Sequence, residues 1–147
     1  MQSLRFGSHL DSRLIPNMID VLLRVPANDW VWAVFEFDGF GIAPDGLNMC
    51  DFQDGLGSQG KGWVFSWNEL LRFAQGVDHA HFCFVAAFDS VNDIQKPPAV
   101  DEAPEGCIIA LEAFDSSEWT IWADDDELLW RFDSLSDSFV PKNVKSM

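Results

Sequence analysis

The stretch CIIALEAFDSSEWTIWAD, residues 107–124, decides the fold. Two apolar segments flank the short polar turn Asp115-Ser116-Ser117, and this arrangement is typical of a β-hairpin. Alternation along the second arm predicts that one face, directed at the core, carries Trp119, Ile121 and Ala123, and that the other carries Glu118, Thr120 and Trp122. The hairpin therefore predicts antiparallel strands near 107–114 and 117–123.

The remaining elements follow from hydrophobic periodicity and capping residues. Runs rich in Val, Phe and Ala or Trp predict strands at 30–38 and 80–88. Helical spacing predicts helices near 14–24 and 125–135, and the capping box Ser66-x-x-Glu69 opens a third helix at 66–75. The segment from 42 to 62 shows little periodicity, so it is expected to be a long exposed connection. Residues 1–147 are thus expected to form a single α+β domain: a mainly antiparallel sheet of about four or more strands, packed by about three helices.

Negative charge is concentrated in one third of the chain. The formal net charge is −15, and the segment from Asp89 to Asp137 holds 14 acidic residues against two basic ones. Such a surface repels nucleic acid and anionic membranes and attracts basic proteins. The plainer interpretation is that the charge serves solubility alone.

The most acidic run lies in WADDDELLWRF, residues 122–132. Asp124-x-x-Glu127 matches a helix-capping pattern, and negative charge is stabilising in a first turn. Capping needs one carboxylate, so the surplus favours an interface in which charge steers a basic partner and a tryptophan anchors it. The predicted binding residues are Asp115, Glu118, Trp119, Trp122, Asp124, Asp125, Asp126 and Glu127. Contiguous acids at a helix start cannot converge on one calcium ion, which argues against a metal cup.

Three other patterns resemble chemistry without specifying it. The glycine-rich GLGSQGKG (55–62) lacks the buried strand that precedes a phosphate-binding loop, and a flexible loop is the favoured interpretation. His79-x-His81-x-Cys83 places three candidate ligands on one strand face, but the face continues into apolar core residues and no fourth ligand is indicated. Glu36 and Asp38 share a strand face, as many carboxylates do in an acidic protein. We therefore predict no catalytic residue, no metal and no cofactor.

The cysteines and the N-terminal residues indicate the compartment. Cys50, Cys83 and Cys107 are widely spaced and form no CxxC pair, which fits a reducing cytosol. The N-terminal MQSLRFGSHLDSRL contains no uninterrupted apolar run of the kind found in secretory signals. A cytoplasmic location without membrane or nucleic-acid partners is expected.

The run ALEAFDSSEWTIWADDDELLWRF (110–132) resembles the C-terminal part of bacterial immunity proteins of contact-dependent inhibition and other polymorphic toxin systems. In those proteins a strand, an Asp-Ser turn, a Trp-bearing strand and a "DDELL" helix start recur. The resemblance implies a small non-enzymatic inhibitor that binds a cognate toxin, often a basic nuclease domain. Two alternatives stay open: an acidic adaptor or chaperone for a basic effector, and a small metal- or nucleotide-dependent enzyme built on 79–83 or 55–62.

Overall fold

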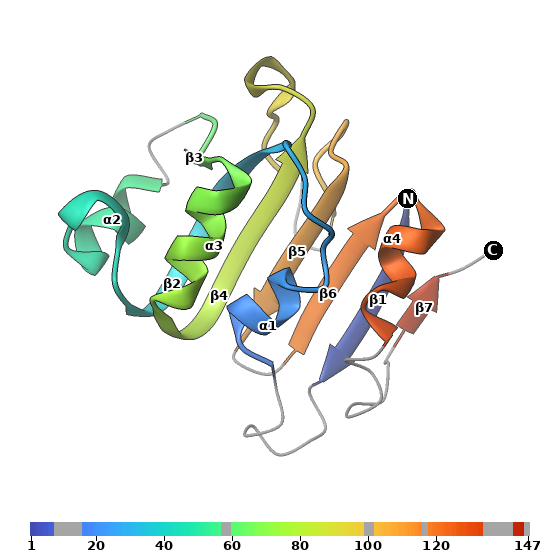
Figure 1. Ribbon diagram of the computed structural model, residues 1–147, viewed down its shortest axis with the longest axis horizontal. Coiled ribbons are helices and arrows are strands. Elements are labelled where there is room, and N and C mark those ends of the chain that lie inside the picture. Colours follow the sequence, from blue (N-terminus) through green and yellow to red (C-terminus); the bar gives the residue numbers. More distant parts are fainter. Residues whose placement is uncertain (8–15, 57–59, 99–101, 116–117, 134–142, 146–147) are drawn as a thin grey trace.

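Seven strands form one sheet in the order β3-β2-β4-β5-β6-β1-β7 (Figure 1). The computed structural model describes residues 1–7, 16–56, 60–98, 102–115, 118–133 and 143–145. Every neighbouring pair of strands is antiparallel. The strands are β1 Gln2–Gly7, β2 Val31–Gly41, β3 Trp63–Phe65, β4 Val77–Phe88, β5 Ile109–Phe114, β6 Glu118–Ala123 and β7 Asn143–Lys145. The predicted α+β class with a mainly antiparallel sheet is confirmed.

Helices cover one face of this sheet. They are α1 Met18–Leu22, α2 Met49–Leu56, α3 Trp67–Gln75 and α4 Asp126–Trp130. In Figure 1, α1, α3 and α4 lie in front of the strands, and α2 lies beside the β2–β3 edge. Their apolar residues share one large core with inward side chains of six strands, among them Trp32, Val85 and Ile121.

The opposite face is covered at its centre by the loop between β4 and β5. Ile94 and Cys107 from this loop form a second buried cluster with Phe84, Ala110 and Trp122 of the sheet. The indole of Trp122 stacks on Phe84 with ring centroids 5.8 Å apart. The central strand β4 is therefore buried on both faces from Cys83 to Phe88.

The predicted elements differ from the observed ones in several places. The strands expected at 30–38, 80–88, 107–114 and 117–123 correspond to β2, β4, β5 and β6, but β1, β3 and β7 were not predicted. The prediction that 42–62 is an exposed connection is wrong, because α2 packs Phe52 and Leu56 into the core. The helix expected at 14–24 spans Met18–Leu22 within the described residues, and that expected at 125–135 ends at Trp130.

Candidate functional site

The acidic run begins where β6 ends and α4 starts. The N-cap of α4 is Asp125, whose Oδ1 accepts hydrogen bonds from the backbone N–H groups of Glu127 at 2.9 Å and Leu128 at 3.4 Å. The prediction that Asp124 caps the helix is wrong by one residue, because Asp124 still lies between the strand end and the cap. Asp125 thus has a structural role that the neighbouring acids do not share.

The other three acids of the run are exposed. Asp124 Oδ1 lies 3.6 Å from the amino group of Met1, and its side chain is 77% exposed. Asp126 and Glu127 occupy the first turn of α4. Among the described residues, no lysine or arginine side chain lies within ion-pair distance of Asp124, Asp126 or Glu127. Within the described residues the charges of Asp126 and Glu127 are thus uncompensated, whereas Asp124 is paired with the Met1 amino group.

A hollow of about 620 Å³ lies beside Asp124. It separates the end of the sheet from the loop 102–107, and its polar lining includes Glu102 and Glu105 together with Asp124. These two loop glutamates were not predicted as site residues, since their Pro-flanked, aperiodic sequence gives no indication that the loop folds back toward β6. We call Glu102, Glu105, Asp124, Asp126 and Glu127 the acidic end.

The thiol that lines the hollow is not activated. Cys107 lines it, but burial and then the negative charge of Asp124 raise the pKa of the Cys107 thiol to about 12. A thiol that remains protonated at neutral pH is a poor nucleophile and a poor metal ligand. The carboxylates around the hollow therefore lie beside a thiol that stays protonated at neutral pH.

The tryptophans predicted as anchors are buried. Trp119 is 3% exposed and donates its indole N–H to the carbonyl oxygen of Pro16 at 3.0 Å, and Trp122 is 7% exposed. The alternation of β6 was predicted correctly. Trp119 lies in the main core, and Trp122 belongs to the second cluster and borders the hollow beside Asp124, so neither ring is an exposed anchor. Trp130 on α4, by contrast, is 62% exposed.

The remaining predicted residues lie at the other end of β6. Asp115 adopts a left-handed backbone conformation (φ 55°), and its Oδ1 lies 3.6 Å from His81 Nε2. Glu118 opens β6 opposite Phe114. At about 3.3 Å per residue, Glu118 and Asp124 are separated by roughly 20 Å. The eight predicted residues therefore do not form one site.

The patterns that resembled metal or nucleotide sites have structural explanations. His79 is exposed, whereas Cys83 is fully buried in the core, and burial raises the pKa of its thiol far above the usual range. The part of the chain that the structure describes contains no group of three or more candidate metal ligands. In the glycine-rich loop, Gly62 has φ +65°, and a Cβ there would lie 2.3 Å from the carbonyl oxygen of Val34. Close packing against β2 accounts for this glycine.

Comparisons with known proteins leave the family open. None of the helices in the described ranges has the length and apolar character that crossing a membrane requires. No family model matches the sequence, and neither the curated proteins nor the solved structures give a match.

Proposed function

We propose that this protein is a non-enzymatic immunity protein, which binds and neutralises a cognate toxin, a basic nuclease domain, through the acidic end. The observation that carries the proposal is that three carboxylates from two separate segments line one hollow at the end of the sheet. Asp124 comes from the end of β6 and Glu102 and Glu105 from the loop before β5, while Asp126 and Glu127 follow Asp124 in the first turn of α4.

The electrostatics support a cationic partner. A surface that binds nucleic acid is positive because it neutralises phosphates. Carboxylates placed opposite such a surface accelerate association and compete with the nucleic acid for the same cations. The capped helix start holds Asp126 and Glu127 on regular backbone, which limits the ordering cost of binding for these two carboxylates.

Trp130 supplies an aromatic anchor beside the charges. Residues three and four positions apart are neighbours on a helix surface, so Trp130 lies next to both Asp126 and Glu127 on α4. Exposed tryptophans are enriched among residues that contribute most to protein binding. Trp130 therefore takes the role that the sequence suggested for Trp119 and Trp122.

The test is charge reversal measured by association kinetics with the toxin domain encoded beside this protein. The double variant Asp126→Lys/Glu127→Lys is expected to slow association about tenfold at low salt and to reduce its salt dependence. Asp51→Lys/Asp54→Lys is the matched control, because these exposed acids lie on α2, at the opposite edge of the sheet in Figure 1. Equal slowing in the two double variants would show that only net charge matters and would contradict the assignment of the acidic end.

The anchor is tested separately. Trp130→Ala is expected to weaken the complex by about 30-fold or more, the effect of losing a central aromatic contact, with little change in association rate. Neutralisation is measured on the same complex: a toxin that stays fully active when saturated with this protein would assign it to the adaptor class instead.

A further inference from the structure

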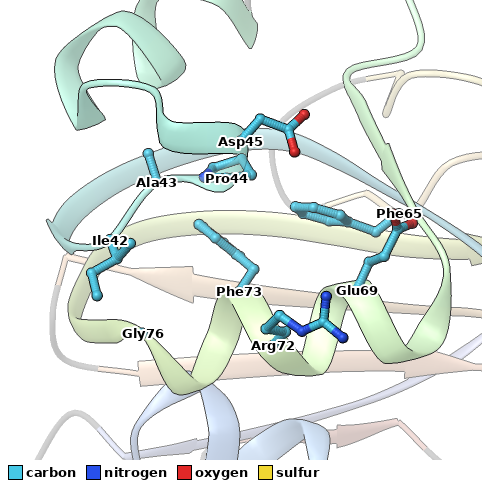
Figure 2. A pocket seen from close by; sticks show the side chains of 9 residues that line it. All are labelled: Ile42, Ala43, Pro44, Asp45, Phe65, Glu69, Arg72, Phe73 and Gly76. Atoms are coloured by element: carbon cyan, nitrogen blue, oxygen red, sulfur yellow. The ribbon is translucent and has the colours of Figure 1, made fainter.

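A second hollow lies beside α3, toward the β2–β3 edge of the sheet and away from α4 and the acidic end (Figure 1). It has a volume of about 350 Å³ and separates α3 from the segment 42–46 that follows β2 (Figure 2). This volume is near the lower limit of ligand pockets in proteins, which begin at about 300 Å³. Its lining combines apolar groups with Asp45, Glu69 and Arg72.

Two largely buried phenylalanines, each 5% exposed, form the apolar floor of this hollow. The rings of Phe65 and Phe73 stack with centroids 5.5 Å apart and an interplanar angle of 27°. Behind them, Phe73 makes an edge contact with Phe37 and a tilted contact with Phe52. Because these rings belong to the main core, the surface is formed before any ligand arrives.

The opposite wall is held in place by backbone contacts. The N–H of Ile42 donates to the carbonyl oxygen of Gly76 at 2.9 Å, and the N–H of Leu47 donates to Pro44 at 3.0 Å. Between them Asp45 adopts φ 57°, a conformation that few residues other than Gly, Asn and Asp tolerate. Figure 2 shows the Asp45 carboxylate on the side of the hollow across from α3, toward the ring of Phe65.

The hollow is lined by two carboxylates and one guanidinium, which lie at different places on its wall. Glu69 lies beside Phe65, where its Oε1 accepts a hydrogen bond from the N–H of Ser66 at 2.8 Å. The Arg72 guanidinium lies at the α3 side, away from Asp45 (Figure 2). Two carboxylates and one guanidinium thus surround an aromatic surface, and the strong negative charge of the whole chain adds to the attraction for cations.

We propose that this hollow accepts a basic side chain of a protein partner, with its methylene stem against Phe65 and Phe73 and its charged group at Asp45. A neutral apolar group would remove water from the Asp45 carboxylate without compensation, and an anion would be repelled by it. A cation close to aromatic rings also gains attraction from their π faces. The inference rests on the proposed function, since it requires a basic partner, but it concerns a different surface.

The experiment uses small probes in place of the partner. Acetyl-arginine methylamide, the neutral acetyl-norleucine methylamide and the anionic acetyl-glutamate methylamide are titrated into the protein. The backbone amide signals of Ile42, Ala43, Asp45, Gly46, Phe73 and Gly76 are followed by NMR. The arginine probe is expected to shift these signals in a saturable manner, and the other two probes are not.

Two variants with opposite expected effects on the affinity for the arginine probe make the test specific. Asp45→Asn keeps a residue that tolerates the turn and is expected to weaken the arginine probe about two- to fivefold, the range of an exposed ion pair. Arg72→Gln removes a repelling cation and is expected to strengthen the same probe by a comparable factor.

The outcomes separate this inference from the proposed function. Preference for the glutamate probe, or no saturable shift with arginine, overturns the inference. If the arginine probe binds while the toxin domain forms no complex, the hollow is supported and the proposed function fails. If the toxin complex forms but the arginine probe does not bind, the proposal for the acidic end is retained and the proposal for the hollow is rejected.

Discussion

Replacing Asp125 by alanine should destabilise the protein, whereas the same change at Asp126 should not. Asp125 accepts two backbone hydrogen bonds at the start of α4, and removing such a cap costs about 0.5–2 kcal/mol. Its negative charge near the helix N-terminus contributes about 0.3–1 kcal/mol more. Asp126 makes only this second contribution, and the better helix propensity of alanine offsets it.

The expected loss for Asp125→Ala is therefore about 1–2.5 kcal/mol in the free energy of unfolding. At roughly 2–4 °C per kcal/mol for a chain of this size, the Tm should fall by about 2–10 °C. Urea unfolding followed by tryptophan fluorescence measures both variants, and Asp125→Asn should recover most of the loss because Asn is also a good N-cap. The reasoning is refuted if Asp126→Ala costs as much as Asp125→Ala, or if neither changes the urea midpoint.

Four further predictions concern the core, a backbone contact, the reactivity of the thiols and the pH dependence of stability. Leu128→Ala should lower the free energy of unfolding by about 2–5 kcal/mol, since Leu128 is buried beneath α4; a loss below about 1 kcal/mol in urea would contradict its place in the core. Gly41→Ala should lower the free energy of unfolding by about 1–3 kcal/mol, because φ at Gly41 is +143° and a Cβ would lie 2.3 Å from the carbonyl oxygen of Gly76 at the end of α3. An unchanged urea midpoint would show that this close contact is not made. In the native protein a chromogenic disulfide reagent should react rapidly with Cys50 alone, because burial raises the pKa of Cys83 and Cys107, and with all three thiols in urea. Because burial raises the pKa values of Cys83 and Cys107, the free energy of unfolding should be independent of these thiols below pH 9 and should decrease above it. In that range the thiols of the unfolded chain ionise and the buried ones do not, and the urea midpoint measured against pH checks this.

Local pattern was sufficient for the central strands and insufficient for the edges of the sheet. The hairpin of β5 and β6 joins segments that are adjacent in sequence, so alternation and turn residues indicated both arms. β1 and β7 pair with each other from opposite ends of the chain, with Leu4 opposite Val144, and no local signal links them. In α2, Phe52 and Leu56 have the i, i+4 spacing of a buried helix face, but the surrounding glycines and acids favoured a loop.

The sequence indicated the negative charge of the candidate site but not the arrangement of its residues in space. Composition showed that the acids are concentrated in one third of the chain, and periodicity gave the correct face for the residues of β6. Burial of Trp122 depends on Ile94 and Cys107 reaching it from a distant loop, which periodicity within β6 cannot reveal. The one-residue error in the cap of α4 likewise reflects the point at which β6 pairing ends, and Ala123 still pairs with Gln2.

The arrangement of exposed apolar side chains explains why charge should dominate recognition. Helices cover one face of the sheet and a loop covers the centre of the other, so most of the aromatic content is enclosed in the two cores. Among the large apolar side chains that remain exposed, Trp130 lies beside the acidic end, Ile42 lines the hollow at α3, and Phe40 lies two residues before it in β2. Because these apolar contacts are small and separated while the carboxylates are clustered, partner affinity should depend more steeply on salt than on any single apolar substitution other than Trp130.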